Sequence, residues 1–323
     1  MRIITPDDII EAVSKLRQRG LGFLLSKFTF NEKSRTRSAF DDAGLQASQW
    51  WIIPRVKERW NERITGDAAV GYEEYFAKKY LLAGGSFRML SLGSGACSHE
   101  LKFARFPQFE EVVCMDIAAN LLREAEQQAR EERLDNMKFL VRDVDQYDFP
   151  PETFDVVLFH ASLHHFRNMD TLLGEKVART LKKGGKIVIH EYVGPNRLQF
   201  PKEQIGEINR ALAAINRTYR RRFRTSFYKN RVYGPGLLRM ILADPSECVE
   251  SERILPTLRK HFTVLEEKPL GGNILMYLLK DIAHHFVDPD TEKSRILNEL
   301  FETEDRFLQR AESDLMFGVY EKR

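Results

Sequence analysis

The sequence predicts an α/β fold built around a mostly parallel sheet, and two observations support this prediction. From residue 87 onward, short apolar runs alternate with stretches of helical periodicity, and about one helix separates each of the first three runs from the next. This alternation is typical of βαβ units. In addition, the stretch MLSLGSGACSHE at 89–100 joins an apolar run to a helix start through two glycines. Such a turn lets a ligand approach the backbone and a helix N-terminus closely.

Short apolar runs predict seven strands, at 88–92, 111–115, 137–141, 154–159, 186–192, 262–267 and 314–323. Helical stretches between them are expected at 98–105, 119–130 and 171–181. The run KKGG at 182–185 indicates the end of a helix and a turn into the next strand.

Helical periodicity dominates the remaining segments, at 1–80, 193–257, 271–286 and 291–312. The chain is therefore expected to have four parts. These are an N-terminal helical cap at 1–84, a core at 85–192, a basic helical lid insertion at 193–257 and a C-terminal part of the core at 258–323.

Composition is that of a soluble globular protein, because 43% of the 323 residues are apolar and 30% are charged. No apolar run reaches the roughly 18 residues that a membrane-spanning helix needs. The N-terminus also lacks the apolar core of a signal peptide. Cys97, Cys114 and Cys248 are too scattered for a disulfide framework or a metal site, so a cytoplasmic location and no bound metal are expected.

The turn after the first strand does not suit a dinucleotide. Gly93 and Gly95 provide the first two glycines of a Gly-x-Gly-x-x-Gly pattern, but Ser98 stands where the third would be. This departure argues against a nicotinamide-dependent oxidoreductase.

Four further features follow in order along the chain. Asp116 ends the second strand, 21 residues after Gly95, where a carboxylate can accept hydrogen bonds from both ribose hydroxyls of an adenosyl group. Asp143 and Val144 end the third strand and offer a carboxylate and an apolar contact to an adenine. The fourth strand ends in the histidine-rich run HASLHHF at 160–166, and LKKGGKIVIHEY at 181–192 contains the fifth.

These five features in this order resemble class I S-adenosylmethionine-dependent methyltransferases, over about residues 85–192. The resemblance implies a Rossmann-like sheet of seven strands, the last antiparallel, with S-adenosylmethionine bound across the carboxyl ends of the strands. On this resemblance Gly93 and Gly95 pass under the methionine part of the cofactor. Asp116 binds the ribose hydroxyls, and Ile117 lies against the adenine.

The resemblance also assigns the rest of the cofactor site. Asp143 and Val144 contact the adenine edge, and His160 lies beside the sulfonium. Tyr72 and Tyr75 of the N-terminal cap are expected to pack over the cofactor from the other side. Two positions depart from the family pattern, because Ser91 stands where the family usually has an acid and Cys97 where it often has a third glycine. Ser91 can hydrogen-bond to the cofactor's ammonium group but brings no charge.

Methyl transfer from a sulfonium is an in-line displacement, so the protein has to align the reactants and in some cases remove a proton. His164, His165 and Glu191 are the candidate catalytic residues, and His190 is a further candidate for the proton. A histidine with a pKa near neutrality is a suitable base for a hydroxyl or an amine. Two DNA chemistries are disfavoured, because HASLHHF contains neither an Asn/Asp-Pro-Pro-Tyr/Phe motif nor a Pro-Cys nucleophile.

A basic segment follows the core. Between Glu207 and Asp244 there are nine Lys and Arg residues and no acid, with five Phe and Tyr residues among them. Arginines interleaved with aromatics suit single-stranded nucleic acid, an anionic small substrate or an anionic membrane surface. Because this family often carries its substrate lid here, Arg221, Arg222 and Tyr228 are candidate substrate-binding residues.

The function that these observations favour is O-methylation of a small molecule, such as a sugar, a glycan precursor or a secondary metabolite. The segment 244–272 supports this choice, because it resembles bacterial methyltransferases of glycan and secondary-metabolite pathways. Two alternatives stay open, which are an RNA-directed methyltransferase that uses the basic segment and a non-catalytic scaffold with a vestigial cofactor fold. The expected partner is a small, anionic acceptor rather than a nucleic acid, and a homodimer is left open.

Overall fold

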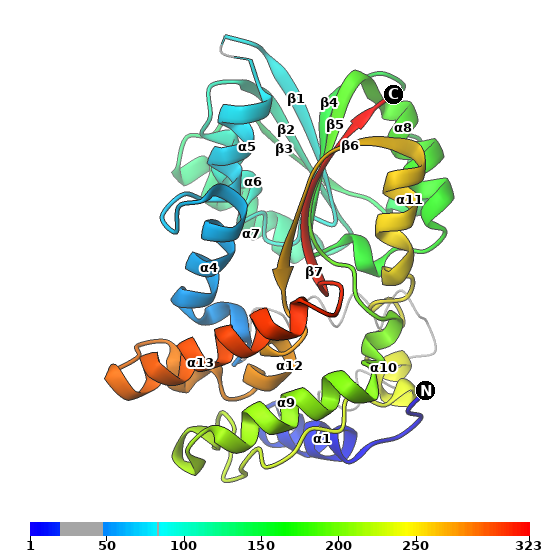
Figure 1. Cartoon of the computed structure of the whole chain (residues 1–323). Coiled ribbons are helices and arrows are strands. Elements are labelled where there is room, and N and C mark those ends of the chain that lie inside the picture. Colours follow the sequence, from blue (N-terminus) through cyan, green and yellow to red (C-terminus); the bar gives the residue numbers. More distant parts are fainter. Residues whose placement is uncertain (20–47, 83) are drawn as a thin grey trace. The chain divides into compact units, whose positions relative to one another are not determined.

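The computed structural model describes residues 1–19, 48–82 and 84–323, without the side chains of 14–19 (Figure 1). The chain forms two compact units, each assembled from three segments. Unit 1 comprises Met1–Trp60, Gly194–Cys248 and Pro269–Leu315. Unit 2 comprises Asn61–Val193, Val249–Lys268 and Met316–Arg323.

A seven-stranded sheet has the order β3-β2-β1-β4-β5-β7-β6. Its strands are β1 Phe87–Leu92, β2 Phe109–Asp116, β3 Met137–Val141, β4 Phe154–His160, β5 Leu181–Tyr192, β6 Phe262–Gly271 and β7 Leu315–Lys322. The five strands from β3 to β5 pair in parallel. Figure 1 shows β7 running opposite to β6, so the sheet is mixed and its last strand is antiparallel. This arrangement confirms the predicted Rossmann-like fold class.

Helices cover both faces of the sheet in unit 2. Figure 1 shows α5 (Tyr72–Tyr80), α6 (Glu100–Ala104) and α7 (Ala119–Glu131) on one side. The other side carries a π-helix at Asp170–Val177, which continues into α8 (Ala178–Thr180), and α11 (Ile254–His261). Between these helices and the strands lies a core of buried aliphatic and aromatic side chains, among them Leu90, Phe159 and Ile189. This core fixes the carboxyl ends of the strands, where the candidate site lies.

Strand β5 is longer than the sequence predicted. Leu181 already pairs with Phe154, and pairing resumes only at Lys186, which lies opposite Val156. The residues between them bulge out, and Gly184 takes a φ of +71° that favours glycine. The expected turn at KKGG is therefore an irregularity inside the strand.

Unit 1 is mainly helical. Its helices are α1 Pro6–Arg19, the 3₁₀ turn Trp50–Ile52, α4 Pro54–Thr65 (which continues into unit 2), α9 Lys202–Ala214, α10 Leu237–Ala243, α12 Leu275–Leu279 and α13 Thr291–Leu308. Further 3₁₀ turns lie at Asn196–Leu198, Arg217–Arg220 and Ala283–Phe286, and one at Ser251–Arg253 precedes α11 in unit 2. Helix α12 packs against α9 and α13.

Two segments differ from the predicted helices. The expected helix over 271–286 is two short pieces, because the backbone extends at Lys280 and Asp281 has a φ of +69°. The residues between Arg221 and Gly236 are not helical. Arg221 instead forms an isolated antiparallel bridge with Tyr228, and Gly234 has a φ of +84° just before Pro235. Among the described residues, no helix has both the length and the apolar character needed to cross a bilayer.

Helix α13 begins with a side-chain cap that can be tested. Asp290 accepts a hydrogen bond from the backbone N–H of Lys293 at 2.9 Å. We expect Asp290→Ala to lower the free energy of unfolding by about 1 kcal/mol, because the N–H loses its acceptor. Urea denaturation measures this change. Asp288→Ala, an exposed acid two residues earlier, is the control. Equal effects of the two substitutions would contradict a specific capping role.

Candidate functional site

The turn after β1 is shaped by its glycines. Gly93 and Gly95 have φ values of +71° and +52°. The N–H of Gly93 donates to the carbonyl of Met115 at 2.8 Å. A Cβ atom on Gly93 would lie 2.8 Å from the Cβ of Ser162, which is too close for a real contact. Glycine at 93 is therefore required by both the backbone conformation and the packing.

Asp116 links this turn to the segment that follows β2. Its Oδ2 accepts a hydrogen bond from the N–H of Gly95 at 2.8 Å, and its Oδ1 accepts one from the N–H of Ala118 at 2.7 Å. The side chain is buried, and Ile117 beside it is half-buried. Because each carboxylate oxygen can accept two hydrogen bonds, Asp116 keeps acceptor capacity for a ligand.

The residues after β3 differ in exposure. Asp143 is half-buried and caps the 3₁₀ turn Val144–Gln146, where it accepts a hydrogen bond from the N–H of Asp145 at 3.0 Å. Val144 is buried and belongs to the core of unit 2. The carboxylate of Asp143 therefore lies beside the carboxyl end of β3 and is partly accessible to solvent.

Ser91 has a buried acidic neighbour that the sequence analysis missed. Its hydroxyl donates to Oε1 of Glu100 at 2.5 Å, and both side chains are buried. Burial raises the pKa of Glu100, although the hydrogen bond from Ser91 acts in the opposite direction. Ser91 stands where the family usually has an acid, so a glutamate nine residues later was a signal available in the sequence.

Four aromatic rings gather at the carboxyl ends of β4 and β5. His160 and His190 are opposite residues in the parallel register, and their ring centroids are 4.8 Å apart. Tyr72 of α5 contacts His160 through a hydrogen bond of 3.0 Å between its hydroxyl and Nδ1. His99 also stacks on His160, with 3.5 Å between the ring centroids. The sequence analysis did not consider His99.

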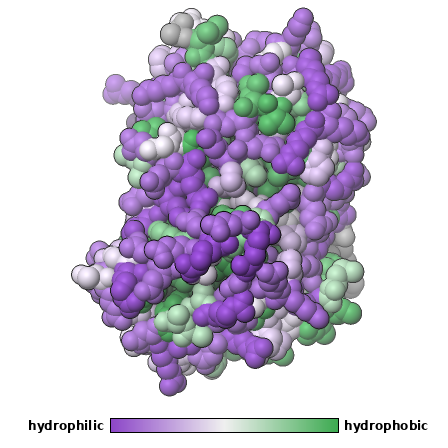
Figure 2. Space-filling model, viewed as in Figure 1, coloured by the Kyte–Doolittle hydropathy of each residue, from purple (hydrophilic) through white to green (hydrophobic). Residues whose placement is uncertain are grey.

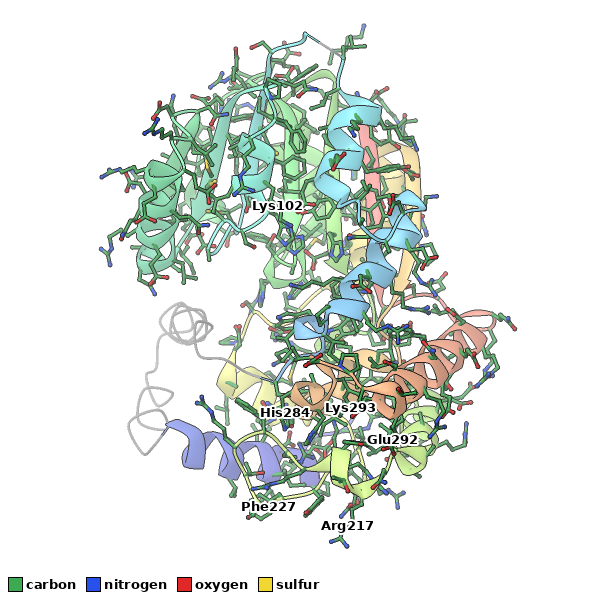
Figure 3. The ribbon with its side chains drawn as sticks, turned by 90° about the vertical axis from the view of Figure 1, so that its left-hand side faces the viewer. Lys102, Arg217, Phe227, His284, Glu292 and Lys293 are labelled. Carbon is green, nitrogen blue, oxygen red and sulfur yellow. The ribbon has the colours of Figure 1, made fainter. Side chains whose placement is uncertain are left out.

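Burial controls the charge of this cluster. Burial, together with the nearby His99, lowers the pKa of His190 to about 4, and the pKa of His160 falls well below its ordinary value for the same reasons. Both imidazoles are therefore neutral at pH 7. Burial alone would raise the pKa of Glu73, but hydrogen bonds from His99 and Lys102 (Figure 3) lower it to about 2. His99 therefore carries a proton on Nδ1, because an ionised carboxylate accepts from that nitrogen.

Glu191 holds the loop after β4. Its carboxylate accepts hydrogen bonds from the N–H groups of Ser162 at 2.7 Å, Leu163 at 2.6 Å and Tyr192 at 2.8 Å, and from Nδ1 of His164. Burial would raise the pKa of Glu191, but His164 and these N–H groups lower it. The carboxylate is thus ionised, fully buried and occupied by hydrogen bonds from the protein.

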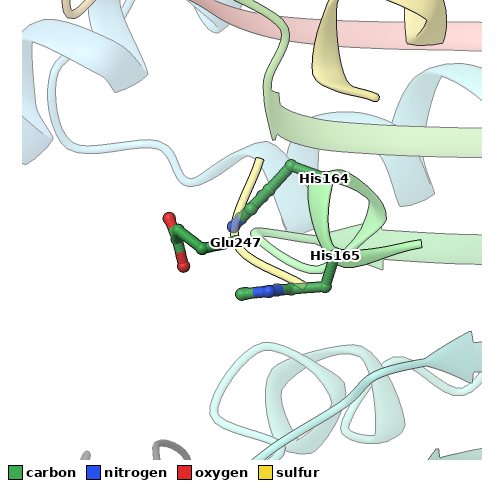
Figure 4. A group of neighbouring side chains, drawn as sticks. All are labelled: His164, His165 and Glu247. Atoms are coloured by element: carbon green, nitrogen blue, oxygen red, sulfur yellow. The ribbon is translucent and has the colours of Figure 1, made fainter. Parts of the chain in front are cut away.

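The two histidines of this loop lie next to each other (Figure 4). The ring centroids of His164 and His165 are 4.2 Å apart, and His164 is the more buried of the two. Since Nδ1 of His164 donates to an ionised carboxylate, Nε2 is its basic nitrogen. The hydroxyl of Tyr75, by contrast, donates to Glu266 of β6 at 2.7 Å.

The three predicted substrate-binding residues lie in unit 1 and have different environments. Arg222 is buried and forms an ion pair with Asp281 at 2.5 Å. Arg221 is exposed and donates to the carbonyl of Thr225 at 3.0 Å. Tyr228 is exposed, and the guanidinium of Arg217 lies 4.9 Å from its ring centroid. Arg221 and Tyr228 are therefore open to solvent, whereas Arg222 is used inside the unit.

The low pKa of His190 predicts acid sensitivity of the fold. In the unfolded chain this imidazole titrates near 6.5, and in the folded chain at about 4. Between these values the unfolded state binds a proton that the folded state does not, so stability falls as the pH decreases from 6.5 to 4. The loss attributable to His190 is about 3 kcal/mol. Denaturant unfolding across this range should show a smaller loss for His190→Gln, whereas an unchanged loss would contradict the assignment. His261→Gln, at a partly exposed position of unit 2, is the control.

Comparisons with known proteins agree with this geometry. The family model of a methyltransferase domain matches residues 90–189, which run from β1 into β5. The chain is 28% identical over 108 residues to YcgJ of Bacillus subtilis, an uncharacterized methyltransferase, covering 33% of this chain and 42% of that protein. It is 29% identical over 118 residues to a demethylmenaquinone methyltransferase of Porphyromonas gingivalis, covering 36% and 47%. The chain thus spans less than half the length of these relatives.

Solved structures show a weaker likeness. Phosphoethanolamine N-methyltransferase 2 of Haemonchus contortus, in complex with S-adenosyl-L-methionine, is 17% identical with a TM-score of 0.49, covering 86% of this chain and 60% of that one. Geranyl diphosphate C-methyltransferase of Streptomyces coelicolor is 12% identical with a TM-score of 0.48, covering 78% and 80%. Residues 90–189 therefore match the methyltransferase-domain family, and the seven-stranded sheet with its antiparallel last strand is the one that the sequence predicts for a class I S-adenosylmethionine-dependent methyltransferase.

Proposed function

We propose that this chain transfers a methyl group from S-adenosylmethionine to an oxygen atom of a small molecule. The observation that carries the proposal is the carboxylate of Asp116, which is held between the N–H groups of Gly95 and Ala118. It lies at the carboxyl end of β2, beside the turn after β1. Ligands of open α/β sheets bind at this edge.

The cofactor would lie along this edge. The turn at Gly93 and Gly95 would pass under its methionine part, with open space beside Gly95, and Asp116 would bind the ribose hydroxyls. Ile117, Asp143 and Val144 would flank the adenine. Because Val144 is buried in the core, its contribution would be through the edge of its side chain and its backbone.

Ser91 and Glu100 would serve the ammonium group of the cofactor together. The hydroxyl proton of Ser91 is donated to Glu100, so its oxygen is left as an acceptor. Glu100 supplies a carboxyl group next to the hydroxyl of Ser91. This pair would replace the acid that the family usually has at position 91.

The chemistry needs alignment and the removal of one proton. When bound, S-adenosylmethionine supplies a methyl group on a positively charged sulfur, which is open to in-line attack. The acceptor hydroxyl forms a bond to the methyl carbon, the carbon–sulfur bond breaks, and the hydroxyl proton leaves to a base. His164 and His165 are the proposed proton acceptors. Glu191 acts as the positioning residue, because it fixes the proton of His164 on Nδ1.

The neutral pair His160 and His190 suits a site next to a positive charge. A protonated imidazole at this edge would repel a sulfonium, whereas neutral rings and the ring of Tyr72 do not. For the acceptor, a sugar, glycan precursor or secondary metabolite is the proposed class.

Calorimetric titration with S-adenosylhomocysteine tests the cofactor site. We expect the wild-type protein to bind and Asp116→Ala to bind at least tenfold more weakly, because two hydrogen bonds from the ribose to a carboxylate are lost. Asp135→Ala, at an exposed acid before β3, should bind like the wild type. Thermal melts of all three proteins separate lost binding from lost folding.

The outcome of the titration decides between enzyme and scaffold. Binding by the wild type justifies a screen of anionic sugars for products that gain one methyl group. Absence of binding in a folded wild-type protein would overturn the methyltransferase proposal and favour a scaffold with a vestigial cofactor fold.

A further inference from the structure

Helix α10 and the N-terminal segment of unit 1 form an exposed apolar face. Leu238, Ile241 and Leu242 lie at positions i, i+3 and i+4 of the helix, which is one side of it, and 38–49% of each residue is exposed. Ile3 and Ile4 are 67% and 65% exposed. The N–H of Leu238 donates to the carbonyl of Ile3 at 3.1 Å, so the two segments are adjacent. Figure 2 shows apolar atoms at the lower right, near α10 and the N-terminus in Figure 1. We call these five residues the α10 face.

A basic surface lies in the same unit, on the segment 217–231 that precedes α10 in the sequence. Arg217, Arg221, Arg224 and Arg231 are exposed, and within the described part of the chain none of them forms an ion pair with a carboxylate. Three exposed aromatics accompany them, which are Phe227, Tyr228 and Tyr233. Figure 3 shows Arg217 and Phe227 near the lower end of the ribbon. The other arginines of the segment include Arg210, Arg222 and Arg239, which are paired with acids.

Hydrogen bonds fasten the basic surface to the α10 face. The N–H groups of Tyr233 and Gly234 donate to Oδ2 of Asp7 at 2.8 and 2.9 Å. The N–H of Gly236 donates to Oδ1 of Asp8 at 2.8 Å. These bonds satisfy the carboxylates of Asp7 and Asp8 with backbone donors and hold residues 233–236 along the N-terminal segment. Residues 233–236, which connect the segment that carries the arginines to α10, are therefore held in place by the N-terminal segment.

We propose that the α10 face and these four arginines dock unit 1 on a bilayer rich in anionic phospholipids. Aliphatic side chains would enter the boundary between headgroups and acyl chains, while the arginines bind lipid phosphates. Exposed tyrosines suit this boundary, because they are apolar at the ring and polar at the hydroxyl. RNA would use the arginines and aromatics but gain nothing from five aliphatic side chains. Peripheral docking needs no spanning helix and does not depend on the proposed methyl transfer.

Co-sedimentation with vesicles tests the proposal. The full chain should bind vesicles of phosphatidylcholine mixed with phosphatidylglycerol, bind phosphatidylcholine alone at least tenfold more weakly, and dissociate as salt rises. Leu238→Ser with Leu242→Ser should weaken binding at least tenfold, because two inserted side chains are lost. Replacing Arg217, Arg221, Arg224 and Arg231 by Gln should weaken it about fivefold per arginine.

Matched controls distinguish binding through this surface from nonspecific binding to vesicles. Leu82→Ser removes a more exposed leucine of unit 2, and Arg123→Gln with Arg130→Gln removes two exposed arginines of α7. These controls should bind like the wild type. The double variant Leu238→Met with Leu242→Met should bind vesicles like the wild type. Thermal melts check that every variant is folded.

Three results would overturn the proposal. One is equal binding to neutral and anionic vesicles, or no binding. Another is tight, salt-sensitive binding of single-stranded RNA that the Leu238 and Leu242 variants leave unchanged, together with weak vesicle binding. The last is a dimer in sedimentation equilibrium that these variants dissociate while vesicles are not bound, which would assign the α10 face to a second copy of the chain.

Discussion

The arrangement of the candidate site depends on one carboxylate, that of Asp116. Its two oxygens accept from the N–H groups of Gly95 and Ala118, so the turn after β1 and the segment leading to α7 are fixed by the same side chain. A buried carboxylate is stable only when hydrogen bonds replace its hydration. The backbone of both crossovers provides those bonds, and in return the geometry of the glycine turn is set before any ligand arrives.

A second buried carboxylate, at the end of β5, is stabilised by hydrogen bonds in the same way. Glu191 organises the loop after β4 through three backbone N–H groups and His164, while Ser162 in that loop donates to the carbonyl of Leu92 at 2.8 Å. The ends of β1, β4 and β5 are therefore linked by polar contacts in addition to the hydrophobic core. Such linkage suits a site that has to align atoms, because small shifts of the loop would be resisted by several hydrogen bonds at once.

Much of the sheet could be predicted from the sequence, because the periodicity of apolar residues and the choice of turn residues are local properties of the chain. The strand at 137–141 has the predicted bounds, and the glycine turn has the expected conformation. Long-range pairings could not be predicted. The contacts of Glu100 with Ser91 and of Glu73 with His99 form only because particular helices cover the sheet. The apolar periodicity of 271–286 gives no sign that Asp281 adopts a left-handed conformation and ends the helix. Local patterns record propensity, whereas these contacts arise from tertiary packing.

The order of the strands also bears on how the chain is made. Strand β7 lies between β5 and β6 in the sheet, although it follows β6 in the sequence. During synthesis β6 leaves the ribosome before its neighbour exists, so it has to wait with an unpaired edge until residues 315–322 emerge. Non-local pairing of this kind is slow and exposes strand edges to wrong partners. The nascent chain is therefore most open to misassociation in the interval between the two strands, a time set by the roughly forty residues that separate them and the elongation rate.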